Sequence, residues 1–104
     1  MKTIKRDELK EKLDNNEVKL VEVLDEEDYN EEHIKGAMNI PLERIGTEAK
    51  KKFDKDDHIV VYCSDFECSA SPTAAKKLDA LGFKNVYDYE GGKKDWKDTG
   101  LPME

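Results

Sequence analysis

Short runs of apolar residues alternate along the chain with longer stretches in which apolar positions recur at helical spacing. The runs have the length and β-branched content of buried strands, whereas the longer stretches place their apolar residues on one helix face. Strands are expected at residues 19–24, 37–40, 58–62 and 85–89. Helices are expected over residues 7–13, 25–32, 42–53 and 71–81, with a short helix around Trp96. This alternation predicts an α/β fold, a mostly parallel sheet with helices on both faces.

The central strand runs directly into a cysteine, Cys63, which is followed by a short polar loop and the start of a helix. Ser71 is of a type preferred at the N-cap, and Pro72 suits the first helical position. The sequence therefore predicts a helix that begins at Ser71, with a curled loop between it and the end of the strand.

Cys63 is the candidate catalytic residue. Ligands of parallel α/β sheets bind beyond the carboxyl ends of the strands, which is where the pattern puts Cys63. Backbone N–H groups of the loop, together with the positive end of the helix dipole, stabilise an anion such as a thiolate. The alternative is a buried cysteine that only packs. The expected active-site loop and anion cradle comprises Ser64, Asp65, Phe66, Glu67, Cys68, Ser69, Ala70 and Ser71.

The loop contains a second cysteine, Cys68, for which two interpretations stand. It is either an incidental loop thiol or a resolving thiol that pairs with Cys63. A disulfide needs Cα atoms about 4.4–6.8 Å apart, which a curled loop can supply. A persulfide on Cys63 would then be released as sulfide while the two cysteines oxidise.

Composition narrows the classes of function. The chain of 104 residues is expected to form one domain, residues 1–104. Lys+Arg 18 against Asp+Glu 25 gives a formal net charge of −7, which argues against nucleic acid or anionic membranes as partners. The first residues lack an apolar signal core and no stretch is long enough to span a membrane, so a cytoplasmic protein is expected. No residue pattern predicts a metal site or a cofactor.

The chain resembles the single-domain rhodanese (sulfurtransferase) family over nearly its whole length. Residues 20–23 resemble the family's early strand, residues 32–41 its histidine-isoleucine-x-glycine-alanine-x-asparagine-isoleucine-proline stretch, and residues 60–63 the strand that delivers its catalytic cysteine. The closing part of the family pattern is matched by Gly82, Phe83, Asn85, Val86, Gly91, Gly92, Trp96, Gly100, Leu101 and Pro102. The resemblance implies a five-stranded sheet and a persulfide-forming cysteine at Cys63. The implied partners are a small sulfur-containing anion such as thiosulfate, or a protein persulfide, and a thiol acceptor.

The sequence also departs from the family pattern. Typical members carry an arginine where Ala70 stands, and the loop here is longer and contains the acids Asp65 and Glu67. Leu24 stands where the family often has an arginine after the early strand, and Glu22 stands where it has an aspartate within that strand. Loss of a charge-assisted bidentate contact should weaken anion binding by about 1.5–3 kcal/mol. The absence of this arginine also argues against a phosphatase or an arsenate reductase.

Two functions therefore remain open. The first is a sulfurtransferase that moves a sulfane sulfur through a persulfide on Cys63. The second is a catalytically weak module that binds a partner or senses redox state through Cys63 and Cys68. The histidines, His33 and His58, are expected to be structural, because neither is placed by the sequence pattern to pair with Cys63.

Overall fold

The computed structural model describes residues 1–104 and contains a five-stranded sheet with the strand order β1-β5-β4-β2-β3. Every pair of neighbouring strands is parallel. The strands are β1 (Lys2–Thr3), β2 (Lys19–Glu22), β3 (Met38–Asn39), β4 (His58–Tyr62) and β5 (Asn85–Asp88). Strand β4 lies at the centre, so its carboxyl end opens between two neighbouring strands. The predicted α/β class and the five-stranded parallel sheet are confirmed.

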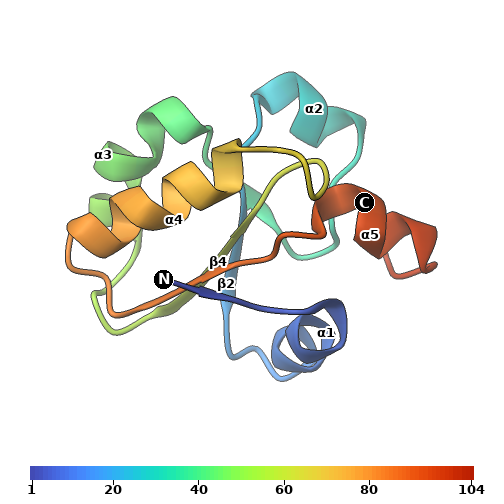
Figure 1. Ribbon diagram of the computed structural model, residues 1–104, viewed down its shortest axis with the longest axis horizontal. Coiled ribbons are helices and arrows are strands. Elements are labelled where there is room, and N and C mark those ends of the chain that lie inside the picture. The colour runs from blue at the N-terminus through green and yellow to red at the C-terminus, as the bar shows by residue number, and fades with distance from the viewer.

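Helices cover both faces of this sheet, as predicted. Figure 1 shows α3 and α4 above the strands and α1 below them. The helical segments are α1 (Arg6–Asp14), α2 (Glu26–Glu31), the 3-10 turn η1 (Leu42–Arg44), α3 (Ile45–Lys52), α4 (Ala70–Ala80) and α5 (Gly92–Asp98). None of them has the length and apolar character that crossing a bilayer requires.

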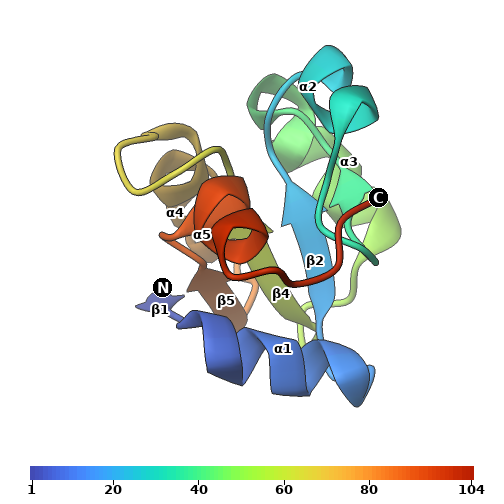
Figure 2. The same ribbon diagram turned by 90° about the vertical axis from the view of Figure 1, so that its right-hand side faces the viewer.

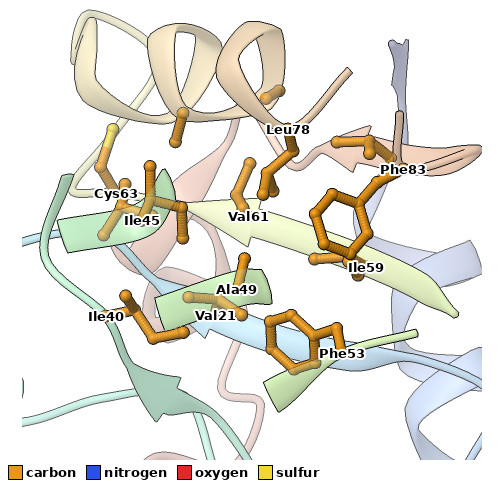
Figure 3. Packing of buried hydrophobic residues seen from close by; sticks show 14 residues of the cluster. Val21, Ile40, Ile45, Ala49, Phe53, Ile59, Val61, Cys63, Leu78 and Phe83 are labelled. Atoms are coloured by element: carbon orange, nitrogen blue, oxygen red, sulfur yellow. The ribbon is translucent and has the colours of Figure 1, made fainter. Parts of the chain in front are cut away.

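Two separate cores lie on the two faces of the sheet, because successive residues of a strand point to opposite sides. In β4, Val61 and the following Cys63 face α3 and α4, whereas Val60 and Tyr62 face α1 and α5. Figure 3 shows the first of these cores, with Cys63 at its edge and its sulfur directed toward the ribbon of α4. The buried aromatic Trp96 belongs to the second core. The cysteine is therefore fixed by the packing of the α4 side.

The structure differs from the sequence-based expectation in two places outside the site. Strand β1 was not predicted, because its two residues are exposed and its place in the sheet comes from backbone pairing with β5. The expected helix over residues 42–53 is divided into η1 and α3. Gly82, just beyond α4, has a φ of 94°, and its N–H donates to the Asp79 carbonyl at 3.0 Å, as is typical of a glycine that ends a helix.

Candidate active site

Cys63 directly follows the carboxyl end of β4, as the sequence predicts. Its side chain is only 1% exposed and packs with the core beneath α4. Its carbonyl oxygen accepts a hydrogen bond of 2.9 Å from the backbone N–H of Lys93, at the start of α5. The backbone of the cysteine is thus held from the opposite side of the sheet from the helix that its sulfur faces.

The structure joins Cys63 to Cys68 in a disulfide, with their Cα atoms 6.3 Å apart. The loop between them folds back on itself. The Cys68 N–H donates to the Asp65 carbonyl at 3.2 Å, and the Glu67 N–H donates to the Asp65 carboxylate at 3.0 Å. Cys68 is partly exposed, whereas Cys63 is buried. The two thiols are therefore within bonding reach, which the hypothesis of a resolving Cys68 requires.

Helix α4 begins at Ala70, so the predicted N-cap at Ser71 is wrong. Ser69 occupies the cap position and its side chain makes no capping hydrogen bond. Ser71 lies instead in the first turn and is buried. Pro72 is tolerated there because N–H groups of a first helical turn have no partner within the helix. Ala70 and Ser71 therefore belong to the helix and not to the loop, although both remain part of the segment that surrounds the cysteine.

The residues of the expected anion cradle include several backbone donors without a partner in the protein. In the segment after Cys63, several backbone N–H groups make no hydrogen bond within the protein: those of Ser64, Asp65, Phe66, Ser69, Ala70 and Ser71. The last two belong to the first turn of α4, where the helix dipole adds a partial positive charge. No arginine lies in this segment; the nearest cations are Lys93, Lys94 and Lys97, which line a shallow pocket together with Ser64 and Asp65.

Side chains of the loop differ in their surroundings. Phe66 is 71% exposed and projects away from the core. Figure 2 shows the loop between β4 and α4, coloured yellow, extending outward from the body of the protein beside α5. Asp65 is turned back onto the loop by its bond to the Glu67 N–H. The loop therefore presents an aromatic ring and negative charge at the surface nearest the disulfide.

The start of α5 contacts the loop after Cys63, which the sequence pattern did not predict. Gly92 has a φ of 66°, and a Cβ at this position would lie 2.7 Å from the Cys63 carbonyl oxygen. This close approach lets the N–H groups of Lys93 and Lys94 bond the carbonyls of Cys63 and Ser64, each at 2.9 Å. A glycine is needed here because a side chain would collide with the backbone on which the cysteine sits.

Glu22, Tyr62 and Lys93 form a buried polar cluster on the face opposite the cysteine sulfur. The Tyr62 hydroxyl donates to one Glu22 oxygen at 2.8 Å, and the Lys93 ammonium contacts the other at 3.2 Å. Burial raises the pKa of Glu22, and burial also raises that of Tyr62, with the Glu22 charge adding to it. Because the Lys93 N–H also bonds the Cys63 carbonyl, this cluster links α5 to β2 and stabilises the contact between α5 and Cys63.

Asp88 is a second buried acid, and it lies on the same sheet face as the cysteine sulfur. It is the last residue of β5, two positions after the core residue Val86, and is 1% exposed. Its Oδ1 atom has no hydrogen-bond partner. Burial, and to a smaller degree the Glu90 charge, raise the pKa of Asp88, while a hydrogen bond with Ser71 lowers it. The residue was predicted only as part of a strand; a charge on an otherwise apolar strand face was the available clue.

The raised pKa of Asp88 gives a test of stability against pH. A carboxyl whose folded pKa exceeds its unfolded value favours folding below the unfolded pKa, and loses that contribution as pH rises through the folded pKa. The ordinary value is 3.8. Asp88→Asn should therefore gain free energy of unfolding relative to the wild type between about pH 5 and about pH 8. Urea unfolding of both proteins at the two pH values measures this; an unchanged difference would contradict it.

The two histidines lie away from the sulfur chemistry. The His33 ring bonds the backbone carbonyl of Tyr29 at 2.9 Å and stacks on the Tyr29 ring. His58 is exposed at the first position of β4, the end opposite Cys63. The structural interpretation of both residues agrees with these contacts.

Comparison with known proteins identifies the family. The family model described as Rhodanese-like domain matches residues 5–99. Thiosulfate sulfurtransferase GlpE from Coxiella burnetii is 33% identical over 81 residues, which cover 78% of this chain and 73% of that protein. Thiosulfate sulfurtransferase PspE from Escherichia coli is 40% identical over 73 residues, 66% of this chain and 64% of that protein. The solution structure of the rhodanese-like domain of the Anabaena Alr3790 protein superposes with a TM-score of 0.89 at 30% identity, covering 100% of this chain and 79% of that one. The chain belongs to the rhodanese-like sulfurtransferase family.

Proposed function

We propose that the protein transfers a sulfane sulfur through a persulfide on Cys63. The observation that carries this proposal is the position of Cys63, at the end of the central strand and next to a segment whose N–H groups are free. The reduced Cys63 thiolate attacks the outer sulfur of a donor such as thiosulfate, and sulfite leaves with the electron pair of the broken S–S bond. An acceptor thiolate then attacks the outer sulfur of the Cys63 persulfide, takes it, and releases the Cys63 thiolate.

The Cys63–Cys68 disulfide sets the first requirement of this reaction. Cys63 bonded to Cys68 has no free thiolate, so a thiol reductant must open the disulfide before sulfur can be loaded. Because Cys68 is the more exposed of the two sulfurs, we expect the reductant to attack Cys68 and to release Cys63 as the thiolate.

The charges around the site bear on the donor. Asp65 and Glu67 are the charged side chains of the loop, and no guanidinium balances them. A doubly charged anion such as thiosulfate therefore meets backbone donors beside two carboxylates, and Lys94, the cation that acts on Asp65, also pairs with Asp98. We propose that a persulfide presented by a thiol or a protein is used more efficiently than thiosulfate, since it carries less negative charge into the site.

Mass spectrometry tests this function. The protein is reduced, freed of reductant and incubated with thiosulfate or with a low-molecular-weight persulfide. A gain of about 32 Da on the peptide that contains Cys63, reversed by cyanide or by a dithiol, is the expected result. Absence of any gain with both classes of donor would overturn the proposal.

A second function is favoured by the disulfide itself. The protein would then act as a redox module, in which Cys63 and Cys68 cycle between the dithiol and the disulfide while a partner disulfide is reduced. The same experiment separates the two, because a loss of about 2 Da without any gain of sulfur indicates oxidation of the pair. If the protein first gains sulfur and then loses it as the disulfide forms, the two functions are successive steps of one cycle.

A further inference from the structure

A line of three side chains runs from the cysteine sulfur into the core beneath α4. The Cys63 sulfur lies 3.3 Å from the Ser71 hydroxyl oxygen. Ser71 also acts on the Asp88 carboxyl, whose pKa it lowers by hydrogen bonding. The residues come from the end of β4, the first turn of α4 and the end of β5, and each is at least nine-tenths buried. The hydroxyl thus stands between a thiol and a buried carboxyl group.

Few other charges act on Asp88. Its partners in the sheet are Thr3 of β1 and Val61 of β4, neither of which carries a charge. The helix packed over it, α4, contributes Ser71 to its surroundings, and the remaining charge that acts on it is Glu90. No cation compensates the carboxylate there. A second negative charge on Cys63, which the Ser71 hydroxyl separates from Asp88, would therefore be strongly disfavoured.

We infer that Asp88 is the proton acceptor of Cys63, acting through the hydroxyl of Ser71. This inference deepens the proposed function and rests on it only in taking Cys63 as the working thiol. When the disulfide is open, the Cys63 thiol gives its proton to the Ser71 oxygen, while the Ser71 hydroxyl proton passes to the Asp88 carboxylate. One proton moves through two hydrogen bonds and no electron changes place. The products are a Cys63 thiolate that accepts a hydrogen bond from Ser71, and a neutral Asp88.

The same relay works in reverse when a thiolate of Cys63 is released. A reductant that attacks Cys68 expels Cys63 as the leaving group, and neutral Asp88 returns a proton to it through Ser71. Once the disulfide is open, the buried site holds one negative charge, on sulfur or on the carboxylate. A site without the acid would instead have to move the proton to and from water, although both groups are buried.

The relay predicts an unusual titration of Cys63. Two coupled groups lose their protons in two macroscopic steps that belong to the pair. The first step, at acidic pH, produces a fraction of thiolate that stays constant over a plateau. The second, at alkaline pH, completes thiolate formation against the charge of Asp88. An isolated cysteine would give a single step.

Ultraviolet absorbance of the thiolate measures this curve in a Cys68→Ser background, with Cys63→Ser/Cys68→Ser as the blank. Adding Asp88→Asn should remove the acidic step and lower the alkaline step by about one to three pH units, because the opposing charge is gone. Adding Ser71→Ala should remove the acidic step without lowering the alkaline one. A matched control, Asp56→Asn, removes an exposed carboxylate at the other end of β4 and should leave both steps unchanged.

A single step in the Cys68→Ser protein, or a curve that Asp88→Asn leaves unchanged, would overturn the relay. An acidic step that survives Ser71→Ala would remove Ser71 from it. If Asp88→Asn does not fold, the Ser71→Ala comparison decides, since it leaves the acid in place. The titration needs no sulfur donor. A two-step curve without persulfide formation would therefore reject the proposed function and keep the relay, and persulfide formation with a single-step curve would do the opposite.

Discussion

Replacing Cys63 by serine is expected to abolish sulfur uptake from thiosulfate and from a persulfide donor. A serine hydroxyl is a far weaker nucleophile than a thiolate at neutral pH and cannot form a persulfide. The site offers a substitute only in Cys68, which is partly exposed and farther along the loop. The same substitution removes the disulfide with Cys68. Intact mass after incubation with each donor measures the loss.

The matched variant is Cys68→Ser, which removes the same disulfide but keeps Cys63. We expect it to take up one sulfur and to keep it longer than the wild type, because the resolving thiol that expels sulfide is gone. Equal lifetimes of the persulfide in the wild type and in Cys68→Ser would show Cys68 to be incidental. Sulfur found on the Cys63→Ser protein would place the working thiol at Cys68 and contradict the assignment of Cys63.

Gly92→Ala is expected to displace the start of α5 from the backbone that carries Cys63. The new Cβ would lie 2.7 Å from the Cys63 carbonyl oxygen and 2.9 Å from the Asp65 nitrogen, and the φ of 66° is itself unfavourable for alanine. Strain of this kind costs on the order of 1–3 kcal/mol. The start of α5 must move away, which weakens the bonds from Lys93 and Lys94 to the loop.

Both stability and activity should therefore fall in Gly92→Ala, the first measured by urea unfolding and the second by the rate of persulfide formation. Gly46→Ala provides the control, because the nearest atom to a Cβ there is Leu81 Cδ1 at 3.9 Å and the backbone is helical. Alanine at that position should stabilise the protein by about 0.5–1 kcal/mol through helix propensity. A Gly92→Ala protein as stable and as active as the wild type would show that the loop does not depend on this contact.

Local patterns in the sequence were sufficient for the architecture and for the cysteine. Apolar runs and helical spacing report burial over a few neighbouring residues, so they located β4, α4 and the position of Cys63 between them. The same patterns missed β1, whose two exposed residues carry no periodicity and are defined by pairing with β5. They also misplaced the start of α4, because Ser71 looks like an N-cap until the sulfur and the carboxyl that it contacts are known.

Only the tertiary structure decided what surrounds the sulfur. Asp88 is 25 residues from Cys63 in the sequence, yet β5 lies beside β4 and both side chains face α4. Gly92 and Lys93 reach the loop because α5 returns across the carboxyl end of the sheet. Contacts between distant segments depend on how strands are ordered and which face each helix covers, and spacing along the chain does not encode them. The sequence by itself determined the fold class and the position of Cys63 at the end of the central strand, and the folded chain determined which acid, hydroxyl and glycine lie around it.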